Sequence, residues 1–392
     1  METKKSRREF LKIGLKMGVV LPFASSILYS CISKSDEKNT TKLTSSKKLK
    51  ILILGGTSFL GPHQIVYAVN RGHSVTTFTR GKTKPSIYKE AFSKVEQLIG
   101  DREDNLTALE NRKWDVVIDN SGRKTEWTKR SAALLKESCD LYIYTSSTGV
   151  YYPYINSDFK EDSKVLTLVP NDSKEDEKLE YDYGVMKATS EQAAMKEFGA
   201  ARTIVVRPTY MIGPADRTNR FIHWPVRLEK GGEVLVPGKK DDAVQYIDVR
   251  DVAEWMIRLA EDKKIGTYNA VGPKEAQNMH EFITEAKKTF AVESSLVMID
   301  DYDFLEENDI YYIVPWIIPT ENTIGSAKIN NQKALQNGLL FRTVHDSVKD
   351  TLDWWKSDAV SEERRTEFVS NPNSIILKEP EIIKKWKALQ HG

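Results

Sequence analysis

A short apolar strand followed by a glycine-rich turn constrains this chain more than any other stretch. Residues 50–54 read Lys-Ile-Leu-Ile-Leu, and residues 55–61 read Gly-Gly-Thr-Ser-Phe-Leu-Gly. The residues that follow place Ile65, Val66 and Ala68 on the apolar face of an amphipathic helix. Glycines permit the tight turn, and the start of the helix can face a pyrophosphate. The stretch therefore predicts the first half of a dinucleotide-binding βαβ unit.

The composition excludes several kinds of site. The chain has 392 residues, enough for a large core and one or two domains, and a net charge of +2. This charge balance gives no reason to expect a nucleic-acid partner. The two cysteines are Cys31 and Cys139, and the six histidines are scattered. Neither a disulfide framework nor a metal site is therefore indicated.

Residues 1–31 have the features of an export signal. Arg7 and Arg8 precede the sequence Glu-Phe-Leu-Lys and a mostly apolar run, a pattern that resembles a twin-arginine signal. The run ends in Leu-Tyr-Ser-Cys, which resembles a lipoprotein cleavage box with Cys31 as the acylated residue. A plain signal peptide or an uncleaved membrane anchor is the alternative. Residues 32–47, rich in Ser, Lys and Thr, are interpreted as a solvated linker. We therefore expect a periplasmic protein or a membrane-anchored lipoprotein.

Strand and helix patterns alternate after the glycine turn. Segments 72–81, 95–104, 114–122 and 141–151 each carry a predicted strand and the turn that follows it. Residues 124–138 between the last two are predicted to form a helix. This order predicts an α/β fold with a Rossmann-type, doubly wound parallel sheet.

Polar residues at the ends of these strands are candidate cofactor contacts. The second strand ends at Thr79 and Arg80, where NAD-binding units carry an acidic residue for the ribose hydroxyl. A cation there suits the extra phosphate of NADP, and the alternative is that Arg80 caps the turn. Asp101, followed by Arg102, could accept a hydrogen bond from the adenine amino group or could simply open the next helix. Asn120 ends the fourth strand, where the central part of the cofactor would pass.

Tyr183 and Lys187 have the spacing of two groups on one helix face. An ammonium near a phenol favours the phenolate and lowers a pKa that is ordinarily about 10. Such a tyrosine can exchange a proton with a substrate hydroxyl while a hydride moves to or from nicotinamide, and Lys187 can also hold the nicotinamide ribose. A Ser or Thr hydroxyl of the turn at Ser146, Ser147 and Thr148 would hydrogen-bond the substrate oxygen.

Together these motifs resemble the extended short-chain dehydrogenases/reductases of the NAD-dependent epimerase/dehydratase family, over residues 49–355. The glycine turn is most like the branch reading Gly-Gly-Thr-x-Phe-Leu-Gly, which includes chloroplast RNA-binding relatives. The resemblance implies that Tyr183 is the catalytic base, Lys187 its partner and Ser147 the catalytic hydroxyl. Ser58 replaces the family's middle glycine, so the backbone there is expected slightly farther from the pyrophosphate. The cofactor contacts that the resemblance implies are Gly55, Thr57, Ser58, Phe59, Leu60, Gly61, Lys187 and Pro208.

The chain is expected to have an NAD(P)-binding domain at 48–210, a smaller C-terminal α/β substrate lobe at 211–357 and a helical tail at 358–392. The lobe begins with segment 216–227, which is dense in Arg and aromatic residues, as a sugar or anion site would be. A helix with a solvated basic face is the alternative. The candidate substrate contacts are Thr148, Arg220, Trp224, Arg227 and Asp248. The last of these could equally form a structural ion pair with Arg250.

Export and a nicotinamide cofactor together favour a closed redox cycle. No free NADP pool exists outside the cytoplasm, so the cofactor is expected to stay tightly bound and to be oxidised and re-reduced within one turnover. Epimerisation, dehydration or internal redox of a carbohydrate through a transient keto intermediate fits such a cycle. Nucleotide-activated sugars are scarce there, which favours a glycoside substrate. A non-catalytic NADP-binding lipoprotein and an RNA-binding relative are the rival interpretations. Family members are often dimers, but no residue pattern selects a homodimer here.

Overall fold

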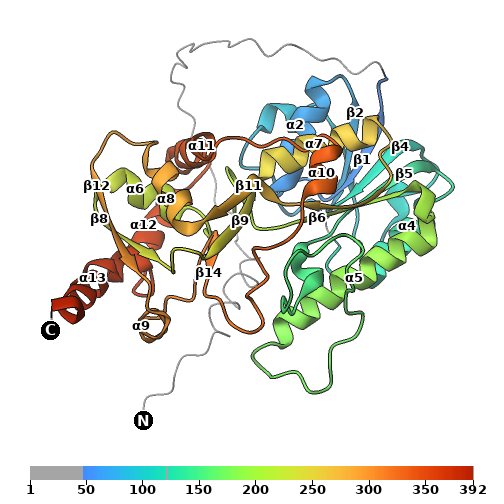
Figure 1. Ribbon diagram of the computed structural model, residues 1–392. Coiled ribbons are helices and arrows are strands. Elements are labelled where there is room, and N and C mark those ends of the chain that lie inside the picture. Colours follow the sequence, from blue (N-terminus) through green and yellow to red (C-terminus); the bar gives the residue numbers. More distant parts are fainter. Residues whose placement is uncertain (1–46, 121, 392) are drawn as a thin grey trace.

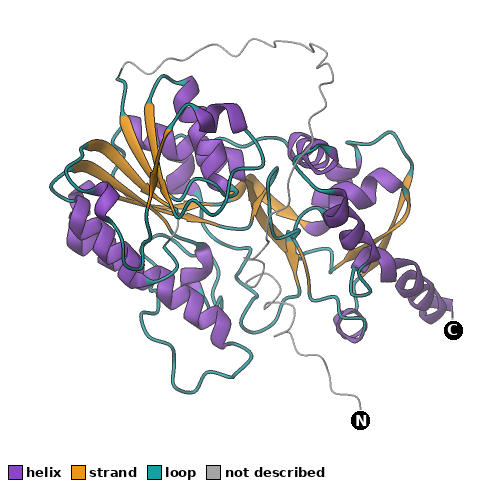
Figure 2. Ribbon diagram, turned by 180° about the vertical axis from the view of Figure 1, so that it is seen from behind, coloured by secondary structure: helices purple, strands orange, loops and turns teal. Residues whose placement is uncertain are grey.

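The computed structural model describes residues 47–120 and 122–391 (Figure 1). One part of the molecule is a seven-stranded sheet with helices on both faces, and the other is a smaller lobe of short sheets and helices (Figures 1 and 2). The predicted export signal, Cys31 and the predicted linker up to residue 46 lie outside the described residues. Within the described part of the chain, no helix is both long enough and apolar enough to span a membrane.

The large sheet is parallel throughout. Its strands are β1 (Lys50–Leu54), β2 (Ser74–Thr79), β3 (Glu96–Ile99), β4 (Trp114–Asp119), β5 (Cys139–Thr145), β6 (Thr203–Pro208) and β10 (Gly266–Ala270). They are arranged in the order β10-β6-β5-β4-β1-β2-β3. Successive strands are added toward one edge of the sheet up to β3 and toward the other edge from β4 on, so the strand order reverses between the neighbours β1 and β4. Ile51 and Leu52, on opposite faces of β1, are both fully buried, as expected for a sheet covered on both sides. The predicted Rossmann-type doubly wound sheet is confirmed.

Helices cover the two faces of this sheet. Those beside it are α2 (Leu60–Asn70), α3 (Lys89–Ser93), α4 (Thr125–Leu135), α5 (Lys178–Phe198), α7 (Val249–Glu261) and α10 (Gln332–Gln336), with short 3-10 turns η1 (Thr107–Leu109), η2 (Thr148–Tyr151) and η3 (Ala200–Arg202). Helices α2 and α7 pack together on one face, and α4 and α5 pack together on the other (Figure 1). Helix α7 and strand β10 come after part of the lobe in the sequence. The large sheet is therefore completed only after the chain has passed through the lobe.

The lobe has its own apolar core and three small sheets. Its strands are β7 (Met211–Ile212), β9 (Ala243–Asp248) and β11 (Gly272–Asn278) in one sheet, β8 (Gly232–Pro237) and β12 (Ser294–Ile299) in another, and the hairpin β13 (Tyr312–Ile313) and β14 (Trp316–Ile317). Its helices are α6 (His223–Lys230), α8 (Met279–Lys287), α9 (Tyr302–Glu307), α11 (Val344–Lys356), α12 (Glu362–Ser370) and α13 (Ile375–His391). Trp224, Phe282 and Trp316 are fully buried at its centre.

The C-terminal helix is an integral part of the lobe. Helix α13 contributes Ile382 and Trp386 to the apolar core, and it packs on β8 (Figure 1). Its Glu379 is 2% exposed, forms an ion pair with Arg227 of α6, and accepts a hydrogen bond from the Leu235 backbone nitrogen at 2.8 Å. Residues predicted only as a helical tail therefore anchor the lobe from inside.

Replacing Glu379 should destabilise the protein. Glu379→Ala is expected to lower the free energy of unfolding by about 3 kcal/mol, because it leaves the buried Arg227 guanidinium without its charge partner. Denaturant unfolding followed by tryptophan fluorescence would measure the change. The matched control is Glu381→Ala on the exposed side of the same helix, which should change stability by less than about 0.5 kcal/mol. Equal stability of the two variants would contradict the anchoring role.

Candidate active site

Tyr183 and Lys187 lie on α5 beside the end of β5. The Tyr183 side chain is 43% exposed, whereas Lys187 is buried. Lys187 Nζ donates a hydrogen bond to the Thr145 carbonyl oxygen at 3.0 Å and lies 5.2 Å from the centroid of the Tyr144 ring. These contacts fix the ammonium at the carboxyl end of the sheet, while the phenol of Tyr183 stays accessible to a substrate.

Lys187 keeps its charge in this setting. Burial lowers its pKa, but the phenols of Tyr144 and Tyr183 and the Asp119 carboxylate raise it, and the resulting pKa lies above the ordinary value. A fixed cation of this kind stabilises negative charge that develops on a nearby oxygen. The pair is therefore arranged so that Tyr183 can accept a proton from a substrate hydroxyl.

Ser147 lies close to Tyr183, because Gly149 is next to both side chains. Ser147 Oγ accepts a hydrogen bond from the Gly149 backbone nitrogen at 3.0 Å and caps η2. The Tyr183 ring packs directly on Gly149, where an added Cβ would lie 2.9 Å from Tyr183 Cε1 and 3.3 Å from Ser147 Oγ. A side chain at position 149 would therefore displace the tyrosine. The structure thus brings the three residues predicted as catalytic together at one end of the sheet.

The side chains of Ser146 and Thr148, on either side of Ser147, interact with other residues of the protein. Ser146 is buried and its hydroxyl donates to the Glu191 carboxylate. Thr148 is also buried, and the phenol of Tyr154 lies near its side chain. Ser147, which is only partly buried, is consequently the hydroxyl of this turn that is best placed to meet a substrate.

A buried network that the sequence did not reveal supports these residues. Arg207 of β6 donates to both oxygens of Glu191 on α5, at 2.9 and 2.7 Å. The same guanidinium donates to the Tyr151 phenol at 2.7 Å, and Tyr151 in turn donates to Asn269 Oδ1 at 2.7 Å. The network ties α5 to the turn that carries Ser147. The only signal in the sequence is that Glu191 follows Lys187 by one helical turn.

The glycine turn leaves the start of α2 suited to an anion. Gly55 and Gly56 have φ angles of 93° and 134°, a region that favours glycine. Gly61 packs so closely on the turn that an added Cβ would lie 2.3 Å from Gly56 Cα. No side chain caps the first turn of α2, so a phosphate can bind its backbone amides. Ser58 is exposed on this turn. The residues present therefore fit a dinucleotide whose pyrophosphate lies at the helix start.

The remaining residues of the turn pack inward. Thr57 is partly buried, and its hydroxyl lies 2.9 Å from the Thr83 hydroxyl. Phe59, the residue just before α2, has a φ of 40° and is partly buried, and Leu60 is buried. Side-chain packing thus holds the turn in place while its backbone remains available. Pro208, at the end of β6, is buried, and its contact with the cofactor stays a prediction.

The polar residues at the strand ends take several roles. Thr79 Oγ1 accepts a hydrogen bond from the Gly81 nitrogen at 3.1 Å, and Arg80 is exposed. Asp101 Oδ1 accepts from the Glu103 nitrogen within its own turn. Asn120 donates to Gln64 on α2 at 2.6 Å and accepts from Thr145 at 2.8 Å, so it joins the glycine-turn helix to β5. The cofactor roles of these residues stay predictions.

Arg102 has a structural role instead of the predicted one. Its side chain is 6% exposed, pairs with the fully buried Asp119, and donates to Ser131 Oγ at 2.8 Å. Tyr142 donates to the same carboxylate at 2.7 Å. Because the guanidinium is held inside the protein by a buried charge, the prediction that the Arg102 side chain binds the cofactor is wrong.

Three of the predicted substrate contacts are also wrong. Trp224 is fully buried, and its indole nitrogen donates to the Val314 carbonyl at 2.7 Å. Arg227 is the buried partner of Glu379. Asp248 caps α7 and pairs with Arg250 at 2.7 Å, which is the alternative that the sequence left open. The aromatic and basic pattern of this segment thus reflects the lobe core.

Thr148 lies in η2 directly after Ser147, and Arg220 lies in the lobe, shortly before α6. Arg220 is partly exposed, donates from Nε to Thr218 Oγ1 at 2.8 Å, and lies 5.8 Å from the centroid of the Tyr210 ring. The contribution of Arg220 and Thr148 to substrate binding stays a prediction.

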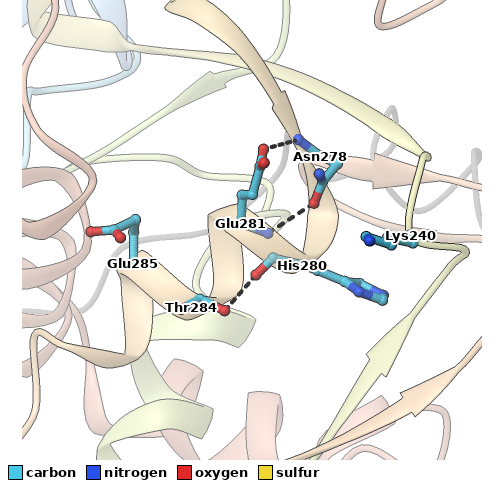
Figure 3. Close-up of a pocket in the computed structure, with 6 residues that line it drawn as sticks. All are labelled: Lys240, Asn278, His280, Glu281, Thr284 and Glu285. Atoms are coloured by element: carbon cyan, nitrogen blue, oxygen red, sulfur yellow. Dashed lines mark hydrogen bonds between the residues drawn. The ribbon is translucent and has the colours of Figure 1, made fainter.

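A surface hollow elsewhere in the lobe has no catalytic constellation. It has a volume of about 300 Å³ at the start of α8 (Figure 3), and Lys240, Asn278, His280, Glu281, Thr284 and Glu285 line it. Asn278 and Glu281 bond each other's backbone nitrogens at 3.0 and 2.9 Å, and Thr284 donates to the His280 carbonyl (Figure 3). These side chains stabilise their own helix, and α8 lies apart from α5 (Figure 1).

The family of the protein follows from a match over most of the sheet and the catalytic residues. Residues 51–271 match the model of the NAD dependent epimerase/dehydratase family. The chain belongs to this family. The resemblance predicted from the glycine turn and the Tyr183/Lys187 pair is thereby confirmed.

Individual relatives in this family are distant. The chain is 29% identical over 254 residues to the chloroplast stem-loop binding protein of 41 kDa b from Arabidopsis thaliana, covering 60% of this chain and 62% of that protein. Among solved structures it resembles dTDP-glucose 4,6-dehydratase from Bacillus anthracis in complex with NAD, with a TM-score of 0.57, 13% identity, and coverage of 80% and 98% of the two chains. It also resembles UDP-glucuronic acid 4-epimerase from Bacillus cereus in complex with NAD, with a TM-score of 0.55, 17% identity, and coverage of 80% and 100%. At these identities the structures establish a shared fold.

Two buried histidines make stability sensitive to acid. Burial lowers the pKa of His63 to about 4, with opposing effects from its hydrogen bond to the Pro214 carbonyl and from Asp248. Burial lowers the pKa of His223 to about 3, and Arg227 lowers it further. Both rings are therefore neutral in the folded state at pH values where an unfolded histidine is charged.

Stability should fall as the pH drops below about 6.5. The unfolded chain takes up protons there while the folded histidines do not, so each contributes a loss of about 2 kcal/mol by pH 5. His223→Phe should reduce the loss between pH 7 and 5 by that amount, measured by denaturant unfolding at both pH values. His345→Gln, at an exposed position of α11, is the control and should leave the loss unchanged. A loss in His223→Phe as large as in the wild type would refute this cause.

Proposed function

We propose that the protein is an exported NAD(P)-dependent oxidoreductase of the epimerase/dehydratase type that acts on a carbohydrate and retains its cofactor. The observation that carries the proposal is the convergence of Ser147, Tyr183 and Lys187 at the carboxyl end of the sheet, beside an open helix start. Family membership supports the reaction type. Export rests on the sequence of residues 1–31, which the structure does not describe.

The chain's own groups account for the proton and for substrate orientation. Tyr183 takes the proton of a substrate hydroxyl at its phenol oxygen, and the Lys187 ammonium stabilises the charge that forms there. Ser147 Oγ donates a hydrogen bond to the same substrate oxygen as it becomes a carbonyl. A bound nicotinamide would supply hydride acceptance and return. The proton then goes back from Tyr183 after the substrate has turned or lost water.

The basic loop after β2 supports a preference for NADP. Thr79 stands where an acidic residue would favour NAD, and Arg80, Lys82 and Lys84 follow as exposed side chains. Three cations at this strand end suit an additional phosphate on the adenine ribose. The solved relatives described above are complexes with NAD, so the preference for NADP is a proposal about this chain alone.

A segment that we call the strap, residues 81–88, supports a retained cofactor. Its Thr83 hydroxyl lies 2.9 Å from that of Thr57 in the glycine turn. Its Ile87 and the turn residue Phe59 pack on one apolar cluster, whose members are Ala215, Ile222, Trp354, Trp355 and Val360. The strap therefore links the glycine turn to α11 of the lobe. We expect these contacts to hinder the release of a cofactor that is bound at the turn.

Loosening the strap should release the cofactor. Ile87→Ala removes three carbons of a partly buried side chain from the cluster, and we expect the bound nucleotide to dissociate about tenfold faster. The fraction of nucleotide retained through repeated gel filtration of the full chain would measure this. Lys89→Ala, at an exposed position just beyond the strap, should retain as much as the wild type. If the wild type itself binds no nucleotide tightly, cofactor retention is wrong.

Removing the Tyr183 hydroxyl should separate catalysis from binding. Tyr183→Phe is expected to slow reduction of the bound nucleotide by carbohydrate substrates by 10²–10⁴-fold, the usual contribution of a general base. Nucleotide affinity should remain nearly unchanged, because Lys187 and the glycine turn are intact. Nicotinamide absorbance gives the rate, and Asp182→Asn, at the exposed neighbouring position, is the control. Undiminished turnover in Tyr183→Phe would refute the catalytic role.

A binding-only function is the rival proposal. The similarity to a plant protein named for stem-loop binding favours RNA as a candidate ligand. The net charge of +2 over 392 residues provides little attraction for a polyanion. A protein that binds a stem-loop RNA or NADP without turnover would be unaffected by Tyr183→Phe, so the same variant separates a catalyst from a non-catalytic lipoprotein.

A further inference from the structure

Three uncharged side chains, Gln64, Asn120 and Thr145, form a hydrogen-bonded row between α2 and the end of β5. Asn120 lies directly after β4, at the centre of the row. Its Nδ2 donates to Gln64 Oε1 at 2.6 Å, and its Oδ1 accepts from Thr145 Oγ1 at 2.8 Å. Its backbone nitrogen donates to the carbonyl of Leu54, the residue before the glycine turn, at 3.1 Å. The row therefore joins α2, β1, β4 and β5 at the carboxyl ends of the strands.

Both ends of the row are held by further contacts. Gln64 is fully buried, and its Nε2 donates to Met256 Sδ on α7 at 3.3 Å. The other end is Thr145, whose carbonyl oxygen accepts the hydrogen bond from Lys187 Nζ at 3.0 Å. Removing one member of the row would leave a buried polar group of its neighbour unpaired, which is costly. The row consequently fixes the distance from α2 to the residue that holds Lys187.

The row lies where the strand order of the sheet reverses. Strands β1 and β4 are neighbours there, and β1 leads into the glycine turn while β4 leads into Asn120. In open parallel sheets, ligands bind in the crevice at this reversal. A dinucleotide that takes part in the proposed reaction has its pyrophosphate at the start of α2 and must bring its nicotinamide to Tyr183. Its two halves therefore bind on elements whose separation the row determines.

The separation matters because the two halves of a dinucleotide are covalently joined. A joined ligand binds more tightly than its parts only when both parts can be engaged at once, and this advantage is lost when the spacing is wrong. Both polar atoms of the Asn120 carboxamide already have partners in the protein, so they do not need the cofactor as a partner. The contacts thus favour a role for Asn120 in spacing over one in direct binding.

We propose that Asn120 is a positioning residue that sets the span between the two halves of the cofactor site. It acts through Gln64 on the helix that receives the pyrophosphate, and through Thr145 on the strand end that holds Lys187. The sequence predicts a direct contact between Asn120 and the cofactor, whereas in this assignment its effect on the cofactor is indirect. The assignment rests on the proposed function, because that function requires a dinucleotide at this site.

The affinities for an intact dinucleotide and for its two halves test the assignment. The full chain is freed of nucleotide on charcoal, and calorimetry is carried out with NADP or NAD, whichever the wild type binds more tightly. The halves are nicotinamide mononucleotide and AMP, the latter with the additional ribose phosphate in the case of NADP. The wild type should bind the intact dinucleotide more tightly than either half.

Thr145→Val removes the hydroxyl from the row but keeps the shape of the side chain and the carbonyl that holds Lys187. It should weaken binding of the intact dinucleotide about fivefold, the loss expected for one hydrogen bond, and leave the affinity for both halves unchanged. Asn120→Ala, which removes both hydrogen bonds of the carboxamide, should show the same pattern with a larger loss. A merely structural role would not change the ratio between the intact dinucleotide and its halves.

Thr203→Val is the matched control. The Thr203 hydroxyl is also buried and donates to the Gly199 carbonyl at 2.9 Å, but it lies at the start of β6, at the opposite end of the sheet. This variant should lose about as much thermal stability as Thr145→Val, because each loses one buried hydrogen bond. It should bind the intact dinucleotide like the wild type.

Two results would overturn the assignment. Unchanged affinity for the intact dinucleotide in both Asn120→Ala and Thr145→Val would show that the row has no effect on the cofactor. Equal losses for the intact dinucleotide and for one half in Asn120→Ala would show a direct contact instead. Binding is measured without turnover, so the two proposals can fail separately. If the variants behave as expected but the wild type reduces no bound nucleotide with any carbohydrate, the proposed reaction alone is refuted.

Discussion

A buried ion pair between α5 and β6 holds the catalytic geometry in place. Both oxygens of Glu191 accept hydrogen bonds from Arg207, and the same carboxylate accepts one from Ser146. Arg207 also holds Tyr151 at the far end of the catalytic turn. Loss of either charge would leave the other buried and uncompensated, at a cost of about 3–5 kcal/mol. One interaction thus sets the distance between the helix that carries the base and the turn that carries the serine.

Much of the fold and part of the site could be predicted because their signals are local. A run of apolar residues, a glycine turn and an amphipathic helix lie within one short stretch and predict the start of a nucleotide-binding unit. The strand-helix alternation that follows predicts the same parallel sheet. Tyr183 and Lys187 are related by the pitch of a single helix, which the sequence determines directly. Ser147 lies in the hydroxyl-rich turn directly after a predicted strand, and the family's pattern selects it from its neighbours. None of these inferences needed contacts between distant parts of the chain.

The predictions that failed concern residues whose partners lie far away in the sequence. Arg102 and Arg227 are polar and appeared available, but Asp119 and Glu379 neutralise them in the interior. Sequence spacing carries no information on such pairs, because tertiary packing alone decides which charges meet. The prediction that Trp224 contacts the substrate failed for a related reason. An aromatic residue that lines a ligand site and one in an apolar core have the same local sequence pattern.

The anchoring of α13 has a consequence for the order of folding. The parallel sheet has all its strands once the chain has been synthesised through β10, whereas the lobe core also needs Ile382 and Trp386. During synthesis the nucleotide-binding half can therefore form while β8 still exposes the surface that α13 will cover. Until then Arg227 has no carboxylate to meet it. A chain that stops before α13, or carries a bulky fusion there, would present a formed glycine turn beside an unfinished lobe, and a chaperone would find its binding surface on β8.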